Sequence, residues 1–515
     1  MRRLIVLTLA LFLLAPPAQA FAHAVGQVQD LPVPFWLYLF GASAVVIISF
    51  VQVILFVGEG HTLQRYPRLN LLGIEPVRVV LTSRALLLGV RLLSVTLFFL
   101  VILSGLLGQQ VADQNFAPIF VWIVWWVGFS FFTAFVGNLW PLVNPWKILF
   151  EWADQFARWL GVEQGIEIGE PYPASWGVWP ALAFYAAFVW IETAFTGSST
   201  PYIIALFILL YSMNTWTGMV LFGNDAWLPR GEMFSVFFGI LGKFAPTEVR
   251  ASDPKLCEEC SGDCPTVQGE CVDCYECFAW ATPEERQLNL RPWAVGLTRT
   301  EEVTLDRLVF VIFVLASVAY HSLVETQLWA ELFTNIFISR TVTLIALPLV
   351  FLAVYLGVMK LSQIFAGISL GFGKPGQLFS RDYAPFREHI PVRRLAAAYV
   401  YTLVPIAIAY QVAHYYTYLL IQGQTIIRLL SDPFGWGWNL FGTAGYKSPT
   451  GSFDPTFVWY SQIAVIVAGH VVAIYLAHVV ALRLLKNPVL AVRSQYPMLG
   501  LMVIYTIFSL WLLSQ

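Results

Sequence analysis

The stretch 85-ALLLGVRLLSVTLFFLVILSGLLG-108 decides the class of fold, because Arg91 is its only charged residue. An α-helix of about 20 mainly apolar residues is long enough to cross the hydrocarbon core of a bilayer. The 515-residue chain is 58% hydrophobic and 12% charged, whereas soluble domains carry about a quarter charged residues. The sequence therefore predicts a membrane protein, and its net charge of −2 gives no indication of nucleic-acid binding.

Further runs of the same character predict an all-α, polytopic membrane protein with about ten transmembrane helices. The predicted spans are 33–57, 85–108, 118–140, 176–195, 201–222, 305–325, 342–364, 394–418, 456–481 and 497–514. Segment 232–244 is shorter and amphipathic, and we expect it to lie at the membrane interface or to re-enter the membrane. Five spans precede the central loop, 223–304, and five follow it. We therefore expect two membrane halves, 23–222 and 305–515.

The first residues have the three parts of a secretory signal peptide. Arg2 and Arg3 precede a short apolar run, 4–14, and small residues up to Ala22 form the expected cleavage site. We predict that residues 1–22 are removed, and that the mature N-terminus lies outside the cytoplasm.

The distribution of positive charge predicts the orientation of the spans. If the N-terminus is outside, five loops fall on the cytoplasmic side, and with Arg307 and Arg394 they hold 22 Lys and Arg residues. These loops are 58–84, 141–175, 223–304, 365–393 and 482–496. The opposite loops hold three, Arg340, Arg428 and Lys447. Because Lys and Arg concentrate in cytoplasmic loops, both termini are expected outside and the central loop inside.

The central loop holds all six cysteines of the chain within 21 residues. They are Cys257, Cys260, Cys264, Cys271, Cys274 and Cys277. Cytoplasmic thiols stay reduced, which argues against three structural disulfides. Cysteines two residues apart suit a structural zinc ion, and the last three cysteines also have the spacing of ferredoxin-type ligands. The sequence predicts a metal site that orders this loop, with zinc, an iron–sulfur cluster and disulfides as alternatives.

Ionisable side chains within spans are costly and are functional candidates. Glu192, His321, Glu325 and His414 fall near the outer ends of three predicted spans, and His470 lies deeper in the ninth. Imidazoles with a carboxylate suit zinc or another divalent metal, which supplies a bound hydroxide as nucleophile. Glu192 or Glu325 would otherwise act as a general base. The competing interpretation is that each group lies in the wet interface or hydrogen-bonds a neighbouring helix.

Several segments resemble a family of bacterial polytopic membrane proteins whose members are labelled fenitrothion hydrolase. They are AHAVGQVQDLPVPFWLYLFGA (22–42), FVWIVWWVGFSFFTAFVGNLWPLVNPWKILFEW (120–152), FAPTE (244–248), SDPFGWGWNLFGT (431–443) and RSQYPMLGLMVIYT (493–506). The resemblance extends over nearly the whole chain. It implies a location in the bacterial inner membrane with periplasmic termini. It also implies hydrolysis of an organophosphate triester, an apolar small molecule that partitions into the outer leaflet.

Two other functions fit the same sequence. Two five-span halves would enter the membrane in opposite senses, which is a transporter architecture. An iron–sulfur cluster combined with haem bound by His414, His470 or His478 would instead indicate a redox protein. The lipid bilayer is the expected partner in every case, and homo- or hetero-oligomeric membrane partners are compatible with all three functions.

Overall fold

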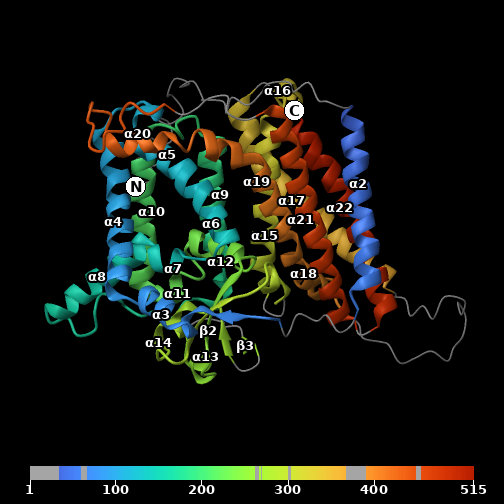
Figure 1. Ribbon diagram of the computed structural model, residues 1–515, viewed down its shortest axis with the longest axis horizontal. Helices are drawn as coiled ribbons and strands as arrows, with labels where there is room; N and C mark the ends of the chain where they lie inside the picture. The colour runs from blue at the N-terminus through green and yellow to red at the C-terminus, as the bar shows by residue number, and fades with distance from the viewer. Residues whose placement is uncertain are drawn as a thin grey trace, which may run out of the picture.

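The computed structural model describes residues 34–58, 66–260, 266–267, 270–299, 303–333, 335–366, 390–447, 454–485 and 487–514. The predicted signal peptide lies outside these residues. Most of the described chain is helical, and ten helices are long and apolar enough to cross a membrane. They stand side by side, with a small β-sheet at one end of the bundle (Figure 1). The prediction of a polytopic helical membrane protein is confirmed.

The ten candidate spans coincide with those predicted from the sequence. They are α2 (Phe35–Phe56), α4 (Arg84–Leu107), α5–η3–α6 (Phe116–Phe135), η4–α9 (Ala174–Thr193), α10 (Pro201–Phe222), α15 (Leu305–Val324), α17 (Ile336–Phe365), α18–η6–α19 (Val392–Ile421), α21 (Pro455–Leu484) and α22 (Pro488–Leu513). Shorter helices connect them. These are α3 (Glu75–Leu81), α7 (Trp140–Val143), α8 (Pro145–Trp159), α11 (Asn224–Trp227), α12 (Met233–Gly242), α13 (Lys255–Glu259), α14 (Tyr275–Trp280), α16 (Gln327–Leu332) and α20 (Thr425–Ser431).

Two spans are irregular in the middle. In the third, a π-helical segment, η3 (Phe120–Phe129), joins α5 (Phe116–Ile119) to α6 (Ser130–Phe135). In the eighth, the turn η6 (Tyr401–Leu403) separates α18 from α19, just before Pro405. Proline has no N–H to donate to the preceding turn, which explains the break. Wider and tighter helical turns of this kind redirect side chains and often occur at functional sites.

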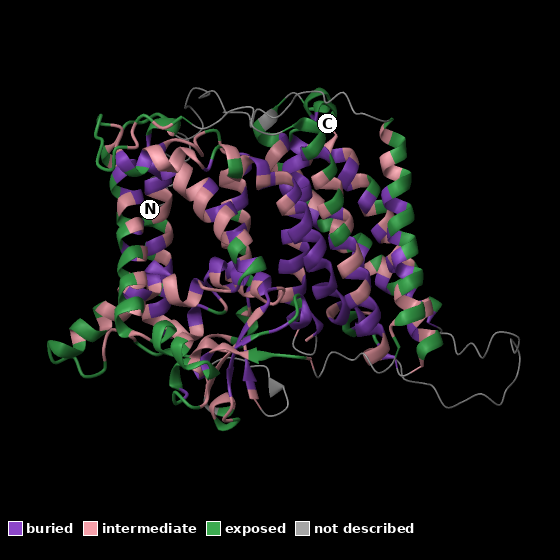
Figure 2. Cartoon of the chain, viewed as in Figure 1, coloured by how far each residue is buried: buried purple, intermediate pink, exposed green. Residues whose placement is uncertain are grey.

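The helices differ strongly in how much of their surface the protein covers. In α15 and in α18–α19, 83% of the apolar stretch is buried, whereas in α4 the figure is 22% (Figure 2). Gly469 of α21 lies so close to Pro405 and Ala409 of α19 that a Cβ would overlap both. Such close helix approach through small residues stabilises membrane bundles. The polar groups on α15 and α19 are therefore held by the most tightly packed helices of the bundle.

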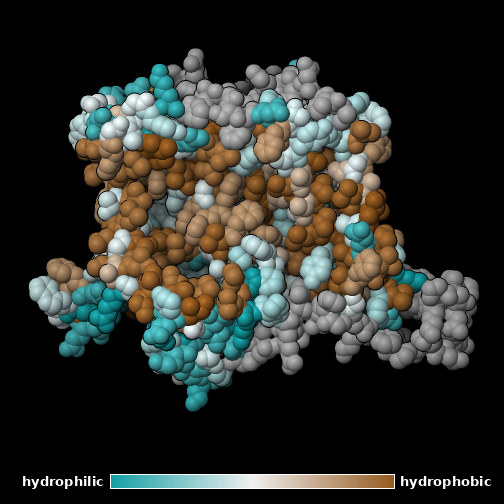
Figure 3. Space-filling view, in the orientation of Figure 1, coloured by the Kyte–Doolittle hydropathy of each residue, from teal (hydrophilic) through white to brown (hydrophobic). Residues whose placement is uncertain are grey.

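The outer surface of the bundle is apolar around its middle. A hydrophobic belt separates the hydrophilic sheet end from the opposite end of the molecule (Figure 3). Large side chains such as Phe40 and Leu55 of α2 are 67% and 71% exposed on this belt. Because apolar side chains gain nothing from contact with water, lipid is the expected solvent for this surface.

The first span packs with the last ones. Helix α2 lies against α21 and α22, at the edge of the molecule farthest from α4 (Figure 1). In space the first span therefore belongs with the spans of the second half, and α9 and the third span also contact that half, through α15, α17 and α19. The sequence order divides the same spans five and five.

Helix α12 corresponds to the short segment expected at the interface. Its side chains are mostly buried, and Phe234 and Phe238 pack against Trp125 and Trp140 from the third span and α7. Its N-cap Glu232 accepts hydrogen bonds from the amides of Phe234 and Ser235. The helix therefore belongs to the protein interior.

The β-sheet has five antiparallel strands in the order β1-β5-β2-β4-β3. They are β1 (Leu69–Asn70), β2 (Thr247–Ala251), β3 (Thr266–Val267), β4 (Glu270–Val272) and β5 (Arg286–Leu290). In the central pair Glu248 lies opposite Asn289. Strand β1 comes from the connection between α2 and α4, so the sheet joins two distant parts of the chain.

A buried network of charges lies at the base of this sheet. Glu248 is 2% exposed and accepts from Arg250 at 2.6 Å, from Arg291 at 2.6 Å and from Arg299 at 2.8 Å. Asp273 also pairs with Arg299, at 2.8 Å. A buried charge is tolerated only when it is paired and hydrogen-bonded. Loss of any one of these side chains would therefore leave a buried charge without its partner.

Candidate functional site

Two of the intramembrane groups predicted from the sequence, Glu192 and His321, meet through a tyrosine. The hydroxyl of Tyr415 lies 2.8 Å from Nδ1 of His321 and donates to Oε1 of Glu192 at 3.4 Å. These residues come from α19, α15 and α9, and they lie near the helix ends remote from the sheet (Figure 1). The structure therefore links a carboxylate to an imidazole inside the bundle.

His414 extends the same cluster. Its ring centroid lies 5.0 Å from that of His321 and 4.6 Å from that of Tyr415. Its Nδ1 is 3.3 Å from Oγ of Ser322. His321 and Tyr415 are buried, whereas Glu192 and His414 are only partly buried, so the two ends of the cluster reach the surface of the chain.

The π-helical segment positions the carboxylate. Trp126 in η3 donates from Nε1 to Oε1 of Glu192 at 3.2 Å, and its indole packs on Phe188 of α9 and Phe237 of α12. A buried tryptophan usually finds a partner for its N–H. Trp126 therefore orients Glu192 toward Tyr415 and shields it from lipid.

Glu325 does not join this cluster, although the sequence places it four residues after His321. Helix α15 ends at Val324, and the carboxylate of Glu325 pairs with Arg340 of α17 at 3.0 Å. Its side chain is 37% exposed. An available guanidinium near the surface draws it outward, so its predicted catalytic role has no support from the geometry.

His470 and His478 also lie apart from the cluster. Nδ1 of His470 contacts the carbonyl of Ile466 in its own helix at 2.9 Å, and its ring faces Tyr505 of α22. His478 contacts Gln495 and the carbonyl of Val57. These contacts fit histidines that pack between helices, and they give no support to His470 as a metal ligand.

Within the described part of the chain, only one group of three His, Cys, Asp or Glu residues brings its ligand atoms within metal-binding distance. It is Cys260, Cys274 and Cys277, whose sulfur atoms all lie within 4.8 Å of one another. His321, His414 and Glu192 form no such group, because Tyr415 lies between the imidazole and the carboxylate. The intramembrane cluster as built is a hydrogen-bonded relay.

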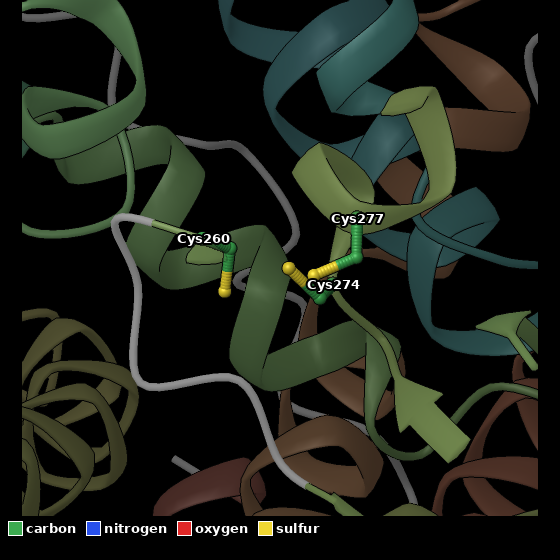
Figure 4. A group of neighbouring side chains, drawn as sticks. All are labelled: Cys260, Cys274 and Cys277. Carbon is green, nitrogen blue, oxygen red and sulfur yellow. The ribbon is translucent and has the colours of Figure 1, made fainter. Parts of the chain in front are cut away.

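The three cysteines come from two short helices of the sheet region. Cys274 caps the N-terminus of α14, Cys277 lies in its first turn, and Cys260 follows α13. The sulfurs of Cys274 and Cys277 lie close together, and Cys260 approaches from the neighbouring segment (Figure 4). Cys257 and Cys271 pack in the same cluster. Five of the six cysteines therefore gather, as a metal site requires.

Three of the predicted ligands are bonded in disulfides. Cys257 and Cys271 form a disulfide, and Cys260 is also disulfide-bonded, whereas the sequence argued for reduced thiols. Cys264 lies outside the described residues. The six-thiolate set is therefore not what the structure holds, because α13 packs against β4 and α14 and brings these sulfurs into bonding contact. A metal would bind to the reduced form of the cluster.

Burial raises the pKa of the Cys274 and Cys277 thiols. Both are therefore protonated at neutral pH without a metal. A bound cation stabilises the thiolate form and displaces these protons, so metal binding to this cluster becomes tighter as the pH rises.

We expect the reduced, purified protein to retain about one zinc ion or one iron–sulfur cluster per chain through these sulfurs. The double substitution Cys274→Ser, Cys277→Ser should remove it, because structural zinc needs four ligands. Elemental analysis measures the loss, and a brown colour distinguishes the cluster from zinc. The control is the double substitution Glu258→Gln, Lys255→Gln on α13. Equal metal content in all three proteins would contradict the site.

Sequence reasoning missed several residues that complete these sites. Tyr415 stands directly after His414 in the string HYYTY, but three tyrosines there are equally plausible from sequence. Trp126 lies in a tryptophan-rich span whose register is unpredictable because of its π-helical turns. Glu248 and its arginines carry no local pattern that predicts burial.

Comparisons with protein-family models, with curated proteins and with solved structures gave no match to this chain. The structure therefore establishes a multi-pass membrane protein with ten candidate spans and a small cysteine-rich sheet region. The resemblance to the organophosphate-hydrolase family stays a prediction from the sequence segments.

Proposed function

We propose that this chain is an integral membrane hydrolase that cleaves an uncharged organophosphate triester at the cluster of Glu192, His321, His414 and Tyr415. The observation that carries the proposal is the Glu192–Tyr415–His321 relay inside the bundle. Enzymes often activate a nucleophile with a base that a further group orients. In the relay His321 is the base, Tyr415 orients it, and Glu192 orients Tyr415.

The relay also indicates which nitrogen acts as the base. Because the Tyr415 hydroxyl donates to Glu192, its oxygen accepts the proton on Nδ1 of His321. This tautomer carries the basic lone pair on Nε2. Nε2 takes a proton from water, the water oxygen bonds to phosphorus, and the aryl oxygen leaves as a phenolate. Glu192 stabilises the resulting imidazolium through Tyr415.

The location of the cluster suits this substrate class. An uncharged aryl triester dissolves in the apolar part of a bilayer, and His321 and Tyr415 lie on two of the candidate spans, α15 and α19. His414 lies beside His321 and can donate to the phosphoryl oxygen as negative charge develops there. Preorganised donors in a site of low dielectric constant stabilise such charge strongly.

The sequence also suggested that a divalent metal activates the water. Both mechanisms, activation by side chains and activation by a metal, are tested with a nitrophenyl phosphotriester and the protein in nanodiscs. Turnover is measured as release of nitrophenolate. Brief exposure to a chelator is expected to leave turnover unchanged, because side chains do the activation. Loss of turnover that zinc restores would assign the step to a metal, and no release above the buffer rate would contradict the hydrolase.

A proton-coupled transporter is the second candidate, because a relay with two partly buried ends also suits proton transfer through a bundle. The first span packs against the last two spans, and this does not support two separate inverted five-helix halves. Proton uptake into proteoliposomes that Glu192→Gln abolishes, without nitrophenolate release by the native chain, would favour this function over hydrolysis.

A further inference from the structure

A large apolar cavity lies beside α9, the helix that also carries Glu192 of the relay. Its volume is about 860 Å³, and α4, the third span, α9, α10 and α12 surround it. Ligand-binding cavities in proteins are usually about 300–1,000 Å³. Aromatic side chains form much of its wall, among them Trp122, Trp125, Trp140, Trp146, Phe188 and Phe234. The cavity is therefore large enough for a small organic molecule.

The cavity is bordered by side chains that face out of the protein. Leu93 of α4, Phe132 of α6 and Leu210 of α10 line it and are 59%, 39% and 62% exposed. All three lie on membrane spans, where the surrounding surface is apolar (Figure 3). A ligand that reached the cavity through this apolar surface would be lipid-soluble.

One polar group in the wall lacks a partner. Asn214 of α10 lines the cavity, and among the described residues its buried Nδ2 has no hydrogen-bond partner. The neighbouring polar groups are satisfied, because Tyr211 and Trp140 both donate to Glu232. A buried amide without a partner destabilises the protein. Nδ2 of Asn214 is buried, so its amide must turn toward the cavity before a ligand oxygen can accept from it, and that hydrogen bond would remove the cost.

We propose that the cavity binds an uncharged, lipid-soluble ring compound, and that a carbonyl-type oxygen of this compound accepts a hydrogen bond from Asn214. Indole and phenyl walls suit a planar ring, because aromatic pairs gain energy beyond simple burial. No Asp, Glu, Lys, Arg or His lines the cavity within the described residues. A charged ligand would lie there unpaired, at high cost.

The cavity and the relay share one wall but are separate sites. Ile191 and Phe188 of α9 line the cavity, whereas Glu192 is turned toward Tyr415. The inference concerns binding alone, and it holds whether or not the relay catalyses hydrolysis. An equilibrium measurement therefore tests it without any assay of turnover.

The test uses 2,3-dimethyl-1,4-naphthoquinone, which has no unsubstituted quinone carbon for thiols to attack, and 2,3-dimethylnaphthalene, which lacks both oxygens. Binding to the full chain in nanodiscs is measured by equilibrium dialysis against empty nanodiscs. The substitution Asn214→Leu is expected to raise the Kd of the quinone about 3- to 10-fold, the value of one hydrogen bond. The Kd of the hydrocarbon should not rise.

A second pair of variants tests the location. Ala187 of α9 lines the cavity, whereas Ala183, one turn earlier and also exposed, does not. The substitution Ala187→Phe should narrow the cavity and raise the Kd of the quinone, and Ala183→Phe should leave the Kd unchanged. Equal binding by both variants would overturn the proposal. So would a phospholipid that co-purifies with the native chain and is lost only in Ala187→Phe.

Discussion

The substitution His321→Gln is expected to lower phosphotriester turnover by about 10²- to 10⁴-fold, the usual contribution of a general base. Glutamine keeps a polar side chain of similar length but cannot accept a proton at neutral pH. Because the base acts only in the chemical step, kcat should fall and KM should change little. Steady-state kinetics in nanodiscs give both constants.

Two matched variants control for loss of structure. His470→Gln removes another buried histidine that lies outside the relay, and its kcat should equal that of the native chain. Tyr415→Phe removes the hydroxyl between Glu192 and His321, whereas Tyr416→Phe removes one that contacts Ser461. Turnover should fall in the first tyrosine variant and persist in the second. Equal turnover in His321→Gln and His470→Gln would exclude His321 as the base.

The second large effect concerns the buried charges beneath the sheet. The substitution Glu248→Gln should destabilise the sheet region by about 3–5 kcal/mol, because removal of one partner leaves buried charges uncompensated. Arg250 and Arg291, each under 5% exposed, would lose their shared carboxylate. Hydrogen exchange of the β2 and β5 amides should become about 10²- to 10⁴-fold faster.

The control is Glu258→Gln, which removes an exposed carboxylate from the same region. Its amide exchange should match that of the native chain, since exposed charges contribute little to stability. If exchange in Glu248→Gln is no faster than in this control, the network does not stabilise the sheet.

Acid should weaken the same network. Burial alone would raise the pKa values of Glu248 and Asp273, but Arg291 and the other arginines outweigh it and hold both below their usual values. A lowered pKa in the folded state stabilises the protein above the unfolded-state value, near 4. This stabilisation is lost as the pH falls through the folded-state values. The protection factors of the β2 and β5 amides, which compare their exchange with the intrinsic rate at the same pH, should therefore fall below about pH 4 in the native chain and much less in Glu248→Gln.

Local patterns predicted much of this structure. The ten spans follow from apolar runs of membrane length, because each helix satisfies its own backbone within the bilayer. The gathering of the cysteines follows from their closeness in the chain. Glu192, His321 and His414 were expected at one depth, because each lies near the same end of its span, and the structure brings them together.

The partners within each site depended on contacts between distant segments. Glu325 was expected beside His321 from its spacing, but Arg340 of another helix draws it to the surface. Tyr415 enters the relay because α19 packs against α15 and against the π-helical span. Cys257 and Cys271 were expected as ligands, yet the packing of α13 on β4 joins them.

The sequence by itself determined the ten candidate spans of the described chain and which residues are costly to bury in them, because hydropathy and length act within single segments. Only the tertiary structure decided that α2 joins the last two spans, that a strand at Leu69–Asn70 completes the sheet, and that Glu248 is surrounded by arginines. It also decided that Tyr415 links Glu192 to His321. These features depend on which segments pack against one another, and this is determined by the contacts of many segments together.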